Sequence, residues 1–79
     1  MNLKPAKEKS MKELKKEIEF IGGNLLETSD GVFIRAYNKD EIKQIQELLK
    51  KYPKYSLGYF AECNLYNWYY YETILMEEL

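Results

Sequence analysis

Cys63 is the first candidate for a reactive side chain, since it is the only cysteine in a chain of 79 residues. A thiol that acts as a nucleophile needs a neighbouring base, and the chain contains no histidine to serve as one. The expected role of Cys63 is therefore that of a small buried strand residue. A single thiol also excludes an intrachain disulfide and, without histidine, leaves no ligand set for a structural zinc ion. We expect no metal, no cofactor and a reducing, cytoplasmic location.

Two carboxylates, Glu62 and Glu72, are the other candidates for catalysis. They could face each other across a hairpin with the loop Asn64–Asn67, and would then form a pair suited to acid–base chemistry. Like charges opposite one another destabilise a sheet, so two solvated side chains are the expected arrangement. Gly22 and Gly23 lack the preceding strand and the following Lys-Ser/Thr of a phosphate loop, and are expected to end a helix. The sequence therefore predicts a protein that is not an enzyme.

Aromatic side chains are concentrated in one stretch, because nine of the twelve aromatic residues lie between Tyr52 and Tyr71. No basic residue follows Lys54. Tyr and Trp are enriched at the centres of protein interfaces, where charged residues are depleted. About half of these rings are expected to line the core, with the remainder at an interface. The stretch predicts protein contacts from Tyr59, Trp68, Tyr69, Tyr70 and Tyr71, with Glu62 and Glu72 as polar partners.

The net charge of −1 hides an uneven distribution. Residues 1–16 carry a balance of +4, residues 17–54 a balance of −1 and residues 55–79 a balance of −4. An acidic, aromatic surface suits a basic partner, because carboxylates can occupy the place of phosphates. The most concrete expectation is thus an inhibitor of a nucleic-acid-handling enzyme, in the manner of small anti-CRISPR-like phage proteins.

Two further functions are compatible with the same residues. Aromatic side chains on a sheet stack nucleic-acid bases, and phosphates then require nearby cations, which could come from Lys12, Lys15, Lys16 and Arg35. Those lysines are far along the chain from the rings, so a solvated helix face explains them more simply. An exposed strand edge at Trp68–Met76 could instead pair with a second copy and give a homodimer.

The N-terminal part of the chain predicts one helix. Residues 1–9 are rich in lysine without a periodic apolar pattern, so we expect this end to be flexible and residues 10–79 to form a single domain. Ser10 is expected to cap the helix with Glu13 at the third position, unless the helix begins earlier with Pro5 in its first turn. The apolar stripe of this helix is formed by Met11, Leu14, Ile18 and Ile21.

The middle of the chain predicts a hairpin and a second helix. The turn Ser29–Gly31 separates a short strand at 24–28 from the alternating run Val32–Tyr37. Asn38 is expected to cap the second helix, again with an acidic residue, Glu41, at the third position. Pro53 ends this helix, whose apolar stripe consists of Ile42, Ile45, Leu48, Leu49 and Tyr52.

The remaining residues predict a second hairpin. Residues 56–63 alternate as in a strand, Asn64–Asn67 can form a four-residue loop, and Trp68–Met76 is rich in strand-forming residues. A helix over 65–78 is the alternative. The expected fold is α+β, with the order α-β-β-α-β-β and two helices on one face of a four-stranded antiparallel sheet. Its other face is open or covered by a partner, and no apolar stretch is long enough to span a membrane.

Overall fold

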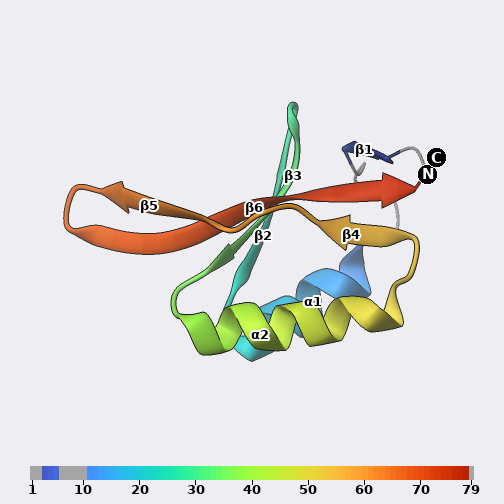
Figure 1. Ribbon diagram of the computed structural model, residues 1–79, viewed down its shortest axis with the longest axis horizontal. Coiled ribbons are helices and arrows are strands. Elements are labelled where there is room, and N and C mark those ends of the chain that lie inside the picture. The colour runs from blue at the N-terminus through green and yellow to red at the C-terminus, as the bar shows by residue number, and fades with distance from the viewer. Residues whose placement is uncertain (1–2, 6–10, 79) are drawn as a thin grey trace.

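The structure, a computed structural model, describes residues 3–5 and 11–78. The described residues form two helices that pack against one antiparallel sheet, and Figure 1 shows both helices on the same side of the longest strand. The predicted α+β class and the one-sided helical layer are confirmed. In chain order the elements are β1 (Leu3–Pro5), α1 (Lys12–Ile21), β2 (Asn24–Thr28), β3 (Gly31–Ala36), α2 (Lys39–Leu48), the 3-10 turn η1 (Leu49–Lys51), β4 (Tyr55–Leu57), β5 (Ala61–Leu65) and β6 (Trp68–Glu78).

Helix α1 follows the predicted apolar stripe, since Met11, Leu14 and Ile18 are buried. The helix begins at Lys12, so the alternative start at Pro5 is wrong, while the predicted cap Ser10 lies outside the described residues. Gly22 ends the helix in the left-handed region (φ 114°), and its N–H donates to the carbonyl oxygens of Ile18 and Glu19. Glycine adopts this conformation without a steric penalty, which explains the sharp end of α1.

Helix α2 begins with the predicted cap. Asn38 Oδ1 accepts a hydrogen bond from the N–H of Glu41 at 2.9 Å. The Glu41 carboxylate reaches back to the N–H of Tyr37 at 2.8 Å, one residue before the usual partner in a capping box. Ile45, Leu48 and Leu49 bury the apolar stripe of α2 and η1 against the sheet, as the spacing predicts.

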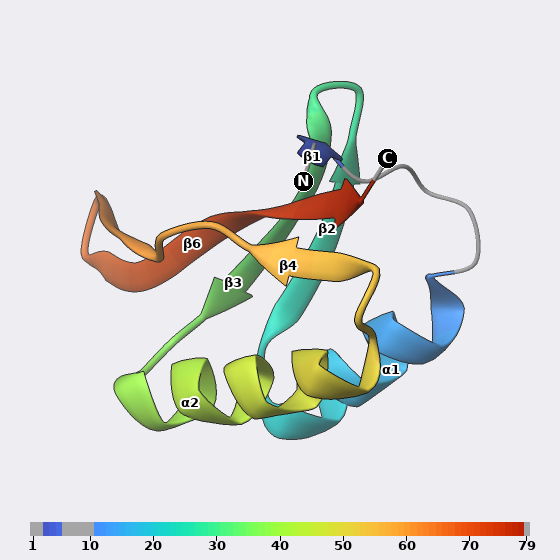
Figure 2. The same ribbon diagram turned by 45° about the vertical axis from the view of Figure 1, so that its right-hand side comes forward.

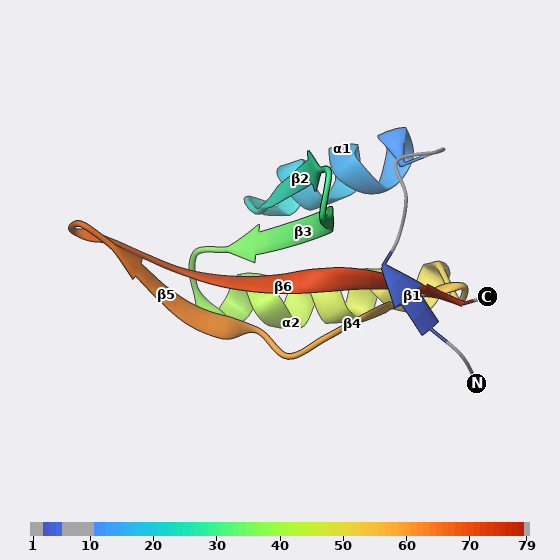
Figure 3. The ribbon, with the colours of Figure 1, turned by 90° about the horizontal axis from the view of Figure 1, so that it is seen from above.

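Strand β6 is the centre of the sheet, because it pairs antiparallel with four other strands. Strand β3 lies along one edge of β6, and β4 and β5 lie along the other (Figure 3). Strand β1 pairs with Met76 and Glu77 of β6, as β4 does, so it lies on the edge opposite β4. Strand β2 pairs with β3 in the predicted hairpin, in a register that places Thr28 opposite Gly31. The predicted strand over Trp68–Met76 is confirmed as part of β6, and the alternative of a helix over 65–78 is wrong.

The structure has two short strands beyond the predicted four, β1 and β4. The predicted continuous strand over 56–63 is interrupted, because residues 58–60 separate β4 from β5. Leu57 lies opposite Leu75 and Ala61 lies opposite Glu72. The three residues 58–60 therefore face only residues 73 and 74 of β6. This one-residue bulge reverses the faces of the strand that follows it. It buries Phe60 and leaves Tyr59 88% exposed.

The loop of the second hairpin is tighter than predicted. Leu65 and Trp68 are paired, so the loop consists of Tyr66 and Asn67 alone. Tyr66 has φ 58°, the left-handed conformation that lets two residues reverse an antiparallel chain. The hairpin β5–β6 extends beyond the end of α2 as a two-stranded arm (Figures 1 and 2).

Candidate functional site

The two faces of the sheet are distinguished by the burial of alternate residues. Val32, Ile34 and Ala36 of β3 and Thr73 and Leu75 of β6 are buried beneath the helices. Residues between them point to the opposite side, which no described helix covers. We call this side the open face; across β2, β3 and β6 it consists of Leu26, Phe33, Arg35, Tyr37, Trp68, Tyr70, Glu72, Ile74 and Met76.

An ion pair lies in the middle of the open face. Arg35 and Glu72 are opposite each other on β3 and β6, and Arg35 Nε donates to Glu72 Oε2 at 2.7 Å. The hydrogen bond that Arg35 donates to Glu72 raises the pKa of Arg35 above its ordinary value. The Arg35 guanidinium carbon also lies 4.5 Å from the centre of the Tyr70 ring, a cation–π distance. Both contacts restrict the position of the guanidinium.

Two more rings flank this ion pair. Tyr37 and Trp68 stack with their centroids 6.3 Å apart and an interplanar angle of 29°. Asn24 Nδ2 donates to the Tyr37 hydroxyl at 2.6 Å, which fixes the outer end of the ring. Trp68 is 64% exposed, so most of its indole faces water despite the stacking. Of the two roles considered for this residue, core and contact, the exposure favours contact.

An apolar band continues from the ion pair along the open face. Cross-strand pairs join Leu26 to Phe33 and Phe33 to Ile74, and Met76 lies farther along β6. All four side chains are half-buried, each covered by its strand neighbours. The open face thus combines an apolar band, three aromatic rings and one neutralised charge pair, the composition of an interface centre.

The sheet divides the predicted protein contacts between two sides. Trp68, Tyr70 and Glu72 lie on the open face together with Arg35, one of the predicted nucleic-acid contacts. Tyr69, Tyr71 and Glu62 lie on the helix side, because consecutive strand residues alternate. Glu62 pairs with Tyr71 and Glu72 with Ala61, so the prediction that these two carboxylates could face each other is wrong.

The helix-side residues form a separate cluster at the arm. The Tyr69 and Tyr71 rings meet edge to face with centroids 5.6 Å apart. The Tyr69 hydroxyl donates to the Glu62 carboxylate, and this hydrogen bond, with partial burial and Tyr71, raises the pKa of Tyr69 to about 12. Tyr59, Glu62 and Tyr71 also line a shallow groove of about 460 Å³ against α2, beside Lys39 and Lys43.

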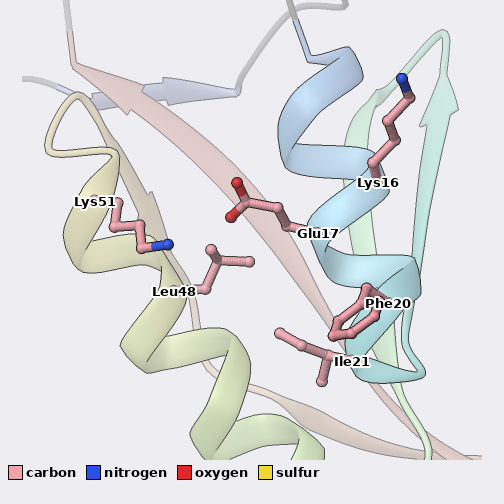
Figure 4. Close-up of a pocket in the computed structure, with 6 residues that line it drawn as sticks. All are labelled: Lys16, Glu17, Phe20, Ile21, Leu48 and Lys51. Atoms are coloured by element: carbon pink, nitrogen blue, oxygen red, sulfur yellow. The ribbon is translucent and has the colours of Figure 1, made fainter.

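The predicted lysines Lys12, Lys15 and Lys16 are exposed on α1, in the helical layer and away from the open face. Lys16 also lines a groove between α1 and α2, opposite Lys51 (Figure 4). This groove of about 430 Å³ is floored by apolar side chains and bordered by Phe20, which is 92% exposed. The structure thus separates the lysines from the rings with which base stacking would require them to act.

Glu17 lies within the same groove and is only partly satisfied. Its Oε1 accepts a hydrogen bond from the Tyr52 hydroxyl at 3.2 Å. Its Oε2 is buried and has no hydrogen-bond partner among the described residues. Burial and this hydrogen bond raise the pKa of Tyr52.

No protein-family model, no curated protein and no solved structure matches this chain. Function is therefore inferred from the geometry of the chain itself. Among the described residues, no group of three or more His, Cys, Asp or Glu side chains is placed to hold a metal ion. None of the described helices is long and apolar enough to cross a membrane.

Sequence reasoning missed the apolar band of the open face. The alternation of Val32–Tyr37 already separated Phe33, Arg35 and Tyr37 from the core residues of the same strand. The same period of two applied to β6 would have grouped Ile74 and Met76 with Trp68 and Tyr70. The alternation thus indicated this face, whereas the aromatic composition alone favoured the consecutive residues Trp68–Tyr71.

Proposed function

We propose that this chain is a non-enzymatic protein-binding domain that docks a partner protein through the open face. The supporting observation is that both described helices pack on one side of the sheet, so no described helix covers the half-buried Leu26, Phe33 and Ile74 on the other side. Burial of apolar surface contributes about 25 cal/mol per Å², so covering this band favours association. The partner must present an apolar surface of complementary shape.

The aromatic part of the open face supplies the anchors. Trp, Tyr and Arg are the residue types that most often dominate binding energy. On the open face Trp68 stacks with Tyr37, and Arg35 lies over the ring of Tyr70. The contacts of Arg35 with Glu72 and of Tyr37 with Asn24 hold these side chains in place before binding. Little side-chain entropy is then lost on docking, which favours affinity.

The most specific version of the proposal is inhibition of a nucleic-acid-handling enzyme. Its support is the acidic charge of residues 55–79. Glu72 and Glu77 form ion pairs with Arg35 and Lys54, which lowers the negative charge that a basic partner would meet. A partner whose apolar surface carries few charges fits the open face better than a phosphate-binding groove does.

Two variants that make the same change, phenylalanine to aspartate, on opposite sides of the sheet test the proposal. Phe33→Asp places a charge in the apolar band, and Phe20→Asp places the same charge on the helical layer, where the phenylalanine is 92% exposed. Wild-type protein, both variants and a blank resin are used as baits in a lysate of the native cell, and bound proteins are quantified. We expect a partner retained in equal amount by wild type and Phe20→Asp and lost with Phe33→Asp, with all three baits folded by circular dichroism. Equal retention by all three, or loss only with Phe20→Asp, contradicts docking through the open face.

Single-stranded nucleic acid is a second candidate for the same face. The observation that favours it is the position of Arg35 among Tyr37, Trp68 and Tyr70, where bases could stack. The neutralisation of Arg35 by Glu72 opposes it, because backbone affinity requires unpaired cations. Titration of an oligonucleotide at low salt, read by Trp68 fluorescence, distinguishes the two. Quenching that weakens steeply with salt would support nucleic acid, and an unchanged signal would exclude it.

A further inference from the structure

The arm carries an unpaired strand edge. Among the described strands β5 pairs only with β6, and no described element lies outside it in the sheet (Figure 3). Four of its five residues, Ala61, Glu62, Asn64 and Leu65, are exposed. An edge of this kind is a ready template for another strand, and a two-stranded ribbon is marginally stable without one.

The register shows which backbone groups of β5 point outward. Leu65 and Trp68 close a two-residue loop, so they form a hydrogen-bonded pair, and such pairs alternate along an antiparallel ladder. Cys63 and Ala61 therefore direct their N–H and C=O groups toward β6. The N–H and C=O groups of Glu62 and Asn64 point away from β6, toward the empty edge. On β6 the residues bonded to β5 are therefore Trp68, Tyr70 and Glu72, and the next alternate residue, Ile74, accepts a hydrogen bond from the N–H of Gly58.

We propose that β5 pairs antiparallel with β5 of a second copy, about a twofold axis that passes midway between the two copies of Cys63. This register places Glu62 opposite Asn64 of the other copy, so the outward N–H and C=O groups form two complete hydrogen-bonded pairs. Leu65, which is 57% exposed, lies opposite Ala61 of the other copy. No carboxylate faces a carboxylate, because Asn64 occupies the position opposite Glu62.

The homodimer expected from the sequence used Trp68–Met76 as its edge. Most of that edge is occupied, because residues 71–74 of β6 are paired with β3 on one side and residues 68–72 with β5 on the other; residues 68–70 lack a described partner on the β3 side. The edge of β2, which among the described strands pairs only with β3, is a poorer match to itself. The same twofold pairing centred on Leu26 would place the buried Leu25 directly opposite the exposed Glu27 of the second copy.

The twofold axis lies perpendicular to the sheet, so both copies present their open faces on the same side. The two open faces then become one continuous surface with two symmetric sets of Arg35, Tyr37, Trp68 and Tyr70. This inference rests on the edge of β5 and does not depend on the proposed function. If both hold, the docked partner contacts two copies of the chain at once.

Cys63 provides the decisive test, because the axis brings it opposite Cys63 of the second copy. Non-hydrogen-bonded pairs have Cα atoms about 4.5 Å apart, a separation that a disulfide can bridge. Sedimentation of the reduced protein over a wide concentration range measures the dimer, and diamide, which takes up the two thiol hydrogens, then oxidises it. We expect a reversible dimer that diamide converts to a covalent one in high yield, with unchanged circular dichroism.

Variants identify the edge. Asn64→Pro removes an outward N–H and leaves the β5–β6 ladder intact, so the dimer dissociation constant should rise about tenfold or more, while Asn64→Ala should change it little. The double variant Cys63→Ser plus Leu26→Cys moves the thiol to the centre of β2, the rival edge. We expect diamide to form no disulfide between two copies of this variant. A concentration-independent monomer, a dimer that Cys63 does not cross-link, or efficient cross-linking through Leu26→Cys overturns the proposal. If Asn64→Pro unfolds, the wild-type cross-link alone decides.

Discussion

Arg35 and Glu72 form an ion pair across β3 and β6 on a face that no described helix covers, with 2.7 Å between Nε and Oε2. Their side chains are 35% and 27% exposed, so water screens the pair only in part. In a double-mutant cycle with Arg35→Met and Glu72→Leu we expect a coupling free energy of about 0.5–1 kcal/mol that falls with added salt. Urea unfolding of the four proteins at two salt concentrations measures it. A coupling near zero at both salt concentrations would contradict a stabilising role for the ion pair.

The hydrogen bond from Tyr52 to Glu17 supports the contact between η1 and α1. Tyr52→Phe removes the donor and leaves the partly buried carboxylate less satisfied, so we expect a loss of about 1–2 kcal/mol in unfolding free energy. Chemical denaturation monitored by circular dichroism provides the measurement. Tyr66→Phe, at a residue that is 92% exposed, is the control and should be neutral. Equal stability of Tyr52→Phe and wild type would show that the bond contributes nothing.

Tyr69 and Glu62 predict a dependence of stability on alkaline pH. The pKa of Tyr69 is raised to about 12 in the folded chain, from an ordinary value of 10.0. A raised pKa means that the neutral hydroxyl stabilises the fold fully below about pH 10, and that this stabilisation is lost as the pH rises through 12. Absorbance titration of the tyrosinates should show one group that ionises late. Glu62→Gln should lower the pKa of that group, and an unchanged titration would contradict the hydrogen bond.

Trp68 is the only tryptophan, so its fluorescence reports on the arm directly. With 64% of its surface exposed, the monomer should emit at long wavelength and be quenched readily by acrylamide. Trp68→Ala should keep the fold, because little buried surface is lost, and should cost 2 kcal/mol or more (on the order of a hot spot) in partner binding. Circular dichroism and calorimetry separate the two effects. Unfolding of Trp68→Ala would assign the ring to the core.

The helices and the first hairpin were predictable because their signals are local. The Asn38 cap, the turn at Ser29–Gly31 and the stop at Gly22 each depend on a few adjacent residues, and the apolar stripes follow a fixed period. The bulge at 58–60 was not predictable, since Leu57, Tyr59, Ala61 and Cys63 continue an unbroken alternation in the sequence. Only the pairing of both segments with β6 shows that one residue is inserted.

The candidate site was predictable in composition but not in position. Trp68, Tyr69, Tyr70 and Tyr71 are consecutive, and a strand must send them alternately to opposite faces. The same alternation that assigns Tyr70 to the open face assigns Tyr69 to the helix side. Which of the two sets faces solvent depends on where the helices pack, and no single segment of the sequence carries that information.

The central position of β6 has a consequence for how the chain is made. Synthesis reaches residues 68–78 after the other elements, yet β1, β4 and β5 all pair with this strand. Until it has left the ribosome, only the helices and the β2–β3 hairpin can form from local contacts. The nascent chain lacks its central strand until then, so the pairings of β6 with β1, β3 and β4 form in a late, long-range step, whereas its pairing with β5 is local.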